Sequence, residues 1–220
     1  MKHPWKPSYL RNQGVLTPAQ RRLLREHWSS YGITLEYGTS IDWAAEFGRN
    51  APLLFDIGFG RGESLVSVAK ARPGWNIVGV EVHRPGIAWA LRRAMAENLT
   101  NIRLIRGDVL WLLTDYVTSP TISEMRIFFP EPWPRAPERR LVRTGTLRIF
   151  ANASIPGAVW RFATDDSTYA AHAEQVFNSV TYLKPVGEDT RCPDRPITVY
   201  ESKGQLAGRT ITDLQYRYTG

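Results

Sequence analysis

A carboxylate stands between two prolines where an apolar, aromatic stretch ends, in the segment Phe128-Phe129-Pro130-Glu131-Pro132-Trp133. Proline fixes φ and cannot donate a hydrogen bond to a sheet ladder, so the strand that this stretch predicts must end here. Ligands of open α/β sheets bind beyond the carboxyl ends of the strands. Glu131, with the flat ring of Trp133 beside it, is therefore a candidate for binding a planar group that donates hydrogen bonds.

A second candidate ligand loop lies upstream, where Asp56-Ile57-Gly58-Phe59-Gly60-Arg61-Gly62 leads from an apolar run into a helical stretch. Glycines let the backbone approach a ligand closely, and a helix N-terminus offers free N–H groups. A dinucleotide fingerprint, G-x-G-x-x-G, would need glycine at position 63, where the chain has Glu63. The spacing G-x-G-x-G after Asp56 instead suits a ligand that carries an ammonium and a sulfonium group.

Two further acids follow the next two predicted strands. Glu81 can accept hydrogen bonds from both hydroxyls of a ribose, and Asp108 can accept one from an adenine amino group. Any one of these acids, taken alone, is more often a helix cap. An acid after each of three successive strands, combined with Gly58 and Gly60, indicates S-adenosylmethionine and a class I methyltransferase fold, ahead of a nicotinamide dehydrogenase.

The elements that must position these residues alternate between apolar runs and helical stretches. Strands are expected at 51–57, 75–82, 102–105, 125–129, 158–164, 182–186 and 210–218. Helices are expected at 17–30, after the capping box Thr17-Pro18-Ala19-Gln20, at 40–47 with Ser40 as its cap, and at 62–71, 85–98, 109–117, 138–153 and 167–180. This order predicts an α/β, Rossmann-like fold with a mostly parallel central sheet and helices on both faces.

The chain divides into two expected parts. Residues 1–16 are polar and basic without periodicity and predict an N-terminal arm, and residues 17–220 predict a single methyltransferase domain. Within that domain, residues 187–208 predict a long polar loop, which in a compact domain is more often functional or disordered than mere filler.

Positive charge is concentrated in two segments. The chain carries 28 Lys and Arg against 21 Asp and Glu, and residues 1–30 hold +5 of the excess while residues 131–148 hold +3. Clustered positive charge favours a nucleic-acid partner, although a solvated helix face would give the same pattern.

Other features exclude several classes of protein. The four histidines lack the spacing of metal ligands, and no apolar run reaches the ~18 residues of a membrane span. The single cysteine, Cys192, excludes an internal disulfide, fits a reducing, cytoplasmic setting, and is expected to be an incidental surface thiol. We therefore expect no metal and no membrane, and a monomer or homodimer.

Motifs over most of the chain resemble the bacterial tRNA (guanine-N7-)-methyltransferase family. The similar segments are Leu16-Thr17-Pro18-Ala19-Gln20, Asp56-Ile57-Gly58-Phe59-Gly60, Gly79-Val80-Glu81-Val82-His83, Phe128-Phe129-Pro130-Glu131-Pro132-Trp133, Arg139-Arg140-Leu141-Val142, Ala163-Thr164-Asp165, and Arg195-Pro196-Ile197-Thr198 with Glu201. The segment that contains Glu131 is the most specific to the family. The resemblance implies a class I, S-adenosylmethionine-dependent enzyme that forms N7-methylguanosine in tRNA.

The resemblance also implies roles for individual residues. The cofactor side would be lined by Asp56, Gly58, Gly60, Glu81, Asp108 and Glu131. The substrate side would be formed by Arg135, Asp165, Thr198 and Glu201. Guanine N7 is already a lone-pair acceptor, so catalysis would require alignment with the methyl group rather than a general base. Glu131 and Asp165 would hold guanine through its N–H donors and offset the developing positive charge.

Departures from the family pattern keep two alternatives open. Glutamate replaces the usual aspartate at 131, arginine replaces lysine at 135, the linker from Trp133 to Arg139 is short, and residues 199–203 are less basic than usual. Changes at the substrate side beside an intact cofactor side would suit a divergent paralogue that methylates another RNA or a small heterocycle. A non-catalytic RNA-binding scaffold that keeps the fold is the third hypothesis.

The two basic segments, residues 1–30 and 135–148, would bind tRNA phosphates without reading sequence. We therefore predict that the logarithm of the association constant for tRNA falls linearly with the logarithm of salt concentration, because each phosphate contact releases counterions. Filter binding or fluorescence anisotropy across a salt series measures the slope. An affinity that does not change with salt would contradict this assignment.

Overall fold

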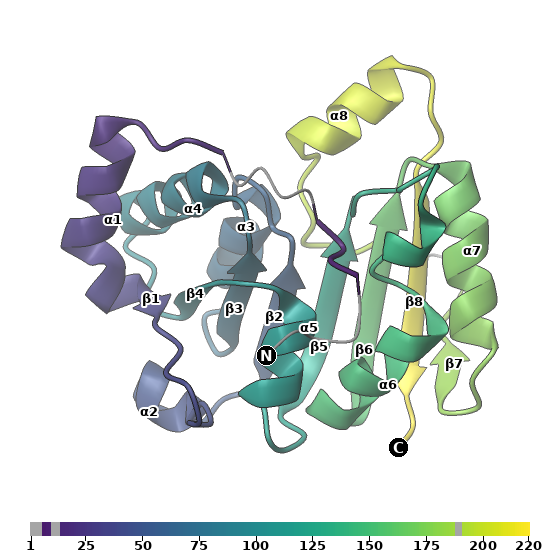
Figure 1. The fold of residues 1–220 in the computed structure, drawn as a ribbon, viewed down its shortest axis with the longest axis horizontal. Helices are drawn as coiled ribbons and strands as arrows, with labels where there is room; N and C mark the ends of the chain where they lie inside the picture. The colour runs from purple at the N-terminus through teal and green to yellow at the C-terminus, as the bar shows by residue number, and fades with distance from the viewer. Residues whose placement is uncertain (1–5, 10–13, 188–190) are drawn as a thin grey trace.

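The computed structural model describes residues 6–9, 14–187 and 191–220. Its centre is an eight-stranded sheet in the order β1-β4-β3-β2-β5-β6-β8-β7 (Figure 1). The strands are β1 (Gly32–Ile33), β2 (Leu53–Ile57), β3 (Asn76–Glu81), β4 (Ile102–Arg106), β5 (Ile122–Phe128), β6 (Ser154–Thr164), β7 (Leu183–Pro185) and β8 (Thr212–Tyr218). Strands β1 to β6 pair in parallel, while β8 is antiparallel to β6 and β7 is antiparallel to β8. The predicted mostly parallel sheet is confirmed.

Helices cover both faces of the sheet because alternate strand residues are apolar on each side. On one face, α1 (Pro18–Tyr31), α3 (Glu63–Ala71) and α4 (Arg84–Ala96) pack against strand residues such as Leu54 and Ile77. On the other face, α2 (Trp43–Phe47), α5 (Val109–Asp115), α6 (Thr144–Ala153) and α7 (Ser167–Asn178) pack against residues such as Phe55 and Val78. Helix α8 (Val199–Leu206) lies beyond the carboxyl ends of the strands (Figure 1).

The helix expected at 138–153 is wrong in its first half. The chain there forms one short 3-10 turn, η1 (Pro137–Arg139), then a bent stretch without regular secondary structure, and α6 begins only at Thr144. Leu141 and Val142, in this stretch, are both buried in the core on the α5 and α6 side of the sheet. Three arginines hold the stretch in place by donating to backbone carbonyls: Arg139 to Pro7, Arg140 to Pro132, and Arg143 to Glu138.

Two further expectations need correction, and one strand was not expected. The polar loop predicted at 187–208 contains α8, whose cap is Thr198: its hydroxyl accepts a hydrogen bond from the backbone N–H of Glu201 at 3.2 Å. Ser40 is not the cap of α2, because Asp42 accepts from the N–H groups of Ala44 and Ala45. Strand β1 was not expected, since its two residues carry no periodicity that could reveal it.

Gly86, in the first turn of α4, lets this helix approach the glycine-rich loop. A Cβ on Gly86 would lie 2.3 Å from the carbonyl oxygen of Gly60, a backbone atom that cannot rotate away. Gly145, in the first turn of α6, offers a matched position, because a Cβ there would meet nothing within 4 Å.

We predict opposite effects of the same substitution at these two glycines. Gly86→Ala should lower the free energy of unfolding by about 1–3 kcal/mol through overpacking. Gly145→Ala should raise it by up to about 1 kcal/mol, since alanine restricts the unfolded chain and favours the helix. Urea denaturation of both variants provides the measurement. Equal effects would show that α4 does not pack against the loop as described.

Candidate active site

A cavity of about 410 Å³ opens beyond the carboxyl ends of β2, β3, β4 and β5. This is the edge at which open α/β sheets bind ligands. The six residues expected on the cofactor side all line it: Asp56, Gly58, Gly60, Glu81, Asp108 and Glu131. The structure therefore brings together side chains that lie up to 75 positions apart in the sequence, from 56 to 131.

The glycine-rich loop takes a conformation that requires its glycines. Gly58, Gly60 and Gly62 have φ angles of 71°, 58° and 77°, in the left-handed region that other residues adopt only under strain. Glu81 fixes the loop from β3: one carboxylate oxygen accepts from Gly60 N at 2.9 Å, and the other accepts from Val82 N and His83 N at 2.7 and 2.9 Å. Glu81 thus shapes the loop and still lines the cavity.

Asp56 is the most deeply buried acid of the cavity, with 1% of its surface exposed. Its Oδ2 atom accepts no hydrogen bond of regular geometry from the described residues, although the nearby Ser64 hydroxyl helps to lower the pKa of this carboxyl group. Burial raises the pKa of Asp56 to about 7, and the positive charge of Arg126 opposes that rise. A buried carboxylate oxygen without a donor costs free energy unless a ligand supplies one. Asp56 therefore fits a cationic group that donates hydrogen bonds.

Asp108 combines two roles that the sequence had left as alternatives. Its carboxylate accepts from Leu110 N at 2.8 Å and caps α5, while the residue also lines the cavity. A carboxylate can accept about four hydrogen bonds, so capping α5 does not by itself exclude contact with a ligand.

The loop that carries Glu131 is held in an unusual conformation. Phe129 and Trp133, on either side of it, have φ angles of 51° and 46°, which are uncommon for residues other than glycine. Strain of this kind persists only where the surrounding structure imposes it. Glu131 itself is exposed and borders the cavity, so its carboxylate is free to meet a ligand.

Trp133 binds the N-terminal arm. Its Nε1 atom donates to the carbonyl of Ser8 at 2.9 Å, and the guanidinium of Arg139 lies 3.4 Å from its ring centroid. Arg139 in turn donates to the carbonyls of Pro7 and Tyr9. Arm residues Ser8 and Tyr9 thereby reach the cavity wall, which was not predicted because the arm carries no pattern that points to the cavity.

The four residues expected on the substrate side are not gathered in one place. Thr198 lines the cavity. Arg135 is exposed, and Asp165 forms an ion pair with Arg209 at 2.8 Å beneath α8. Glu201 is fully buried and bonded to Arg191 and Arg195. Arg135, Asp165 and Glu201 are absent from the cavity wall, and their substrate roles stay predictions.

Several cavity residues were missed by sequence reasoning because they lie in the segment expected to be a loop. Tyr200 and Lys203 project from α8, and the Thr-x-x-Glu cap at 198–201 was the signal that could have revealed this helix. Glu63, at the start of α3, accepts from Val199 N at 2.9 Å and joins α8 to the cofactor loop.

Within the ranges that the structure describes, no group of three or more His, Cys, Asp or Glu side chains is arranged to hold a metal ion. In the same residues no helix has the length and apolarity needed to cross a membrane.

Known proteins share the fold and much of the sequence of this chain. Residues 50–214 match a family model described as "Putative methyltransferase". Solved structures with the same fold include the 16S rRNA methyltransferase KamB (TM-score 0.60, 13% identity, 84% of this chain and 96% of that one). Another is a mutant of the 16S rRNA (adenine(1408)-N(1))-methyltransferase from Catenulisporales acidiphilia with cosubstrate SAM (TM-score 0.54, 15% identity, 82% of this chain and 93% of that one).

Similar sequences extend over nearly the whole chain. A tRNA (guanine-N(7)-)-methyltransferase of Nitrosococcus oceani is 37% identical over 212 residues, which cover 96% of this chain and 89% of that protein. Proteins of the same name from Methylococcus capsulatus and Mycolicibacterium paratuberculosis are 37% and 36% identical over 96% and 92% of this chain, and the matches cover 93% and 83% of those proteins. The chain belongs to the tRNA (guanine-N7-)-methyltransferase family.

Proposed function

We propose that this protein transfers the methyl group of S-adenosylmethionine to N7 of a guanine in tRNA. The observation that carries the proposal is the unpartnered, buried oxygen of Asp56 in a cavity where Glu81, Asp108 and Glu131 also converge. Such a set of acceptors suits a ligand that is cationic at one end and carries ribose and adenine donors at the other. Membership of the family is the reason for proposing guanine as the nucleobase and tRNA as the RNA.

The acids are assigned by depth in the cavity. Asp56 binds the ammonium group of the cofactor, Glu81 the ribose hydroxyls, and Asp108 the adenine amino group. The cofactor, when bound, supplies an electrophilic methyl group on its sulfonium. The chain's own task is then to hold guanine N7 in line with that methyl group, since N7 needs no deprotonation.

Glu131 is the residue proposed to hold the guanine. It borders the cavity, and its carboxylate can accept from the N1–H and N2–H₂ donors of the base and offset positive charge on the ring. Asp165, which directly follows β6, is proposed to assist, and Arg209 would have to release it because the two now form an ion pair.

The exposed arginines are the ones proposed to bind RNA phosphates. In the second basic segment, Arg139, Arg140 and Arg143 already donate to backbone carbonyls, whereas Arg135 and Arg148 are exposed. On α1, Arg22 and Arg25 are exposed. Phosphate binding therefore falls to fewer residues than the net charge of either segment suggests.

The direct test incubates the protein with methyl-labelled S-adenosylmethionine and unmodified tRNA, then digests the RNA and identifies the labelled nucleoside. We expect label in N7-methylguanosine. Label in another nucleoside would favour the divergent paralogue, and absence of both label and cofactor binding would favour the non-catalytic scaffold; either outcome would overturn the proposal.

A matched pair of variants tests the role of Glu131. Glu131→Gln should lower kcat by about 100-fold, because it removes a charge aimed at the developing positive charge. Glu138→Gln changes an exposed acid of the same segment, whose partner is Lys6, and should leave kcat unchanged. Equal activity of both variants would remove Glu131 from the mechanism.

The pKa of Asp56 predicts a pH dependence of cofactor binding. Because burial raises this pKa to about 7, the carboxyl group is protonated at lower pH and cannot pair with a cation. Affinity for S-adenosylmethionine should therefore rise with pH, by up to about tenfold per unit below pH 7, and then level off. The charged neighbours of Asp56 are Arg126, Glu81 and Asp194.

Calorimetric titration between pH 5.5 and about 8.5 measures this dependence. Asp56→Asn should bind weakly at every pH and flatten the profile. The stability of the ligand-free protein should change in the opposite direction. Because the pKa of Asp56 is higher in the folded than in the unfolded protein, its contribution to the free energy of unfolding is present at low pH and is lost as pH rises from 3.8 to about 7. An affinity that is constant across this range would contradict the assignment.

A further inference from the structure

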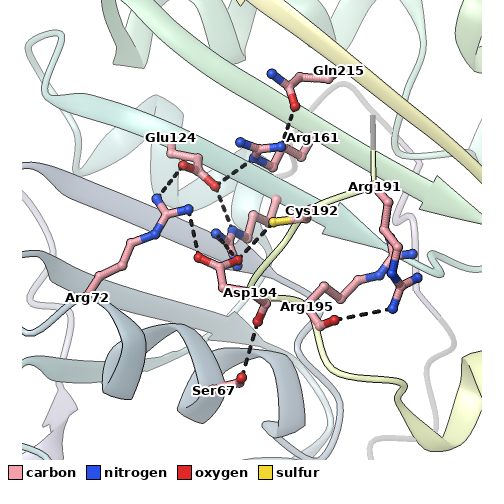
Figure 2. Close-up of polar contacts among 10 residues, drawn as sticks. Ser67, Arg72, Glu124, Arg161, Arg191, Cys192, Asp194, Arg195 and Gln215 are labelled. Carbon is pink, nitrogen blue, oxygen red and sulfur yellow. Dashed lines mark hydrogen bonds and ion pairs between the residues drawn. The ribbon is translucent and has the colours of Figure 1, made fainter. Parts of the chain in front are cut away.

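One part of the sheet has a charged surface beneath a loop instead of an apolar surface beneath a helix. On the face of β5 and β6 that continues the α3 side, Glu124, Arg126 and Arg161 project from neighbouring strands. The segment 191–198 covers them (Figure 2). Burying charges is costly, so the arrangement requires a compensating network.

The network is a closed ring in which positive and negative side chains alternate. Arg72, at the end of α3, binds Glu124 and Asp194, each at 2.7 Å. Arg126 binds the same two acids, each at 2.8 Å. Arg161 adds a third bond to Glu124 at 3.0 Å. Of the four ring members, only Asp194 comes from the segment 191–198.

Both acids of the ring are ionised. Burial would raise their pKa values, but the arginines dominate: Arg126 and Arg72 hold the pKa of Glu124 and of Asp194 below the usual range. The backbone of Asp194 is fixed as well, because its carbonyl accepts from the hydroxyl of Ser67 on α3 at 3.2 Å. Cys192, expected at the surface, is 1% exposed and donates to the carboxylate of Asp194.

From this anchor the chain leads directly to the cavity. Arg195, the next residue, binds Asp213 of β8 with two hydrogen bonds and contacts Glu201 of α8. Its guanidinium also lies over the ring of Phe128, 5.0 Å from the centroid, just before the loop of Glu131. Thr198, four positions after Asp194, lines the cavity and caps α8, which presents Tyr200 and Lys203.

We propose that Arg126 and Asp194 are positioning residues for the substrate side: they fasten the segment 191–198 to the sheet and so fix Thr198 and α8 at the mouth of the cavity. An apolar cover could have closed this face with less desolvation cost, whereas the ring fixes a single register of the segment. The inference rests on the proposed methyl transfer to RNA, because it assigns these residues a role in that reaction.

The first test removes the negative charge of Asp194 and keeps a side chain of nearly the same size and shape. In Asp194→Asn, kcat/KM for tRNA should fall by about 10- to 100-fold, since a misplacement of about 1 Å in a catalytic arrangement has effects of that order. At pH 8.5, where Asp56 is ionised whether or not its charged neighbour Asp194 is present, the dissociation constant of S-adenosylmethionine should stay near the wild-type value. Asp194→Glu, which keeps the charge, should recover part of the activity.

Arg161→Gln is the matched control. It removes another arginine of the same cluster, but Arg161 binds Glu124 and Gln215 and does not hold Asp194. The control should lose stability and retain kcat/KM for tRNA. Equal losses of activity in Arg161→Gln and Asp194→Asn would show that the cluster only stabilises the fold and would overturn the inference.

Hydrogen–deuterium exchange supplies a readout that needs no substrate. In Asp194→Asn, exchange should rise in peptides from 191–206 and stay unchanged in β2 to β5. A uniform rise over the whole chain, or none in 191–206, would overturn the inference. If wild-type protein labels no tRNA guanine, the proposed function fails on that result alone, while exchange still reports whether the anchor exists.

Discussion

The cofactor side and the substrate side of the site both depend on the positive charge of the buried Arg126 guanidinium. Arg126 on β5 is in register with Asp56 on β2, and its guanidinium forms an ion pair with Asp194. The same positive charge therefore lies beside the cofactor side and beside the segment that leads to the substrate side. Three arginines, Arg72, Arg126 and Arg161, surround two carboxylates, Glu124 and Asp194, and one positive charge is left in excess. Ionised Asp56 cancels that excess, whereas burial favours the protonated acid. A cationic ligand resolves this conflict by pairing with the ionised form.

The cofactor side could be predicted from sequence because its geometry follows from local rules. Parallel strands end at a common edge, and an acid at the end of each strand must lie near the others. The chain supplies Asp56, Glu81 and Asp108 in this way, and the G-x-G-x-G turn identifies the edge. Only the bond of Glu81 to Gly60 needed the structure, since it depends on how far the loop folds back.

The substrate side could not be predicted to the same degree because it depends on pairs that are distant in the sequence. The bond between Arg126 and Asp194 requires both the register of β5 and the path of a loop that carries no periodicity. For the same reason the polar segment 187–208 was expected to be a loop, although part of it folds into α8, in which Glu201 is buried. The arginines at 139, 140 and 143 looked like RNA contacts, yet each binds a carbonyl, a choice that charge counting cannot reveal.

The claim that Arg126 sets the charge of the cofactor carboxylate can be tested by observing Asp56 itself. Carboxyl ¹³C resonances of aspartate-labelled protein, followed against pH, give the pKa of Asp56 in the wild type and in Arg126→Gln. We predict a pKa of about 7 in the wild type and a higher value in the variant, because the opposing positive charge is gone. An unchanged pKa in the variant would contradict the central role given to Arg126.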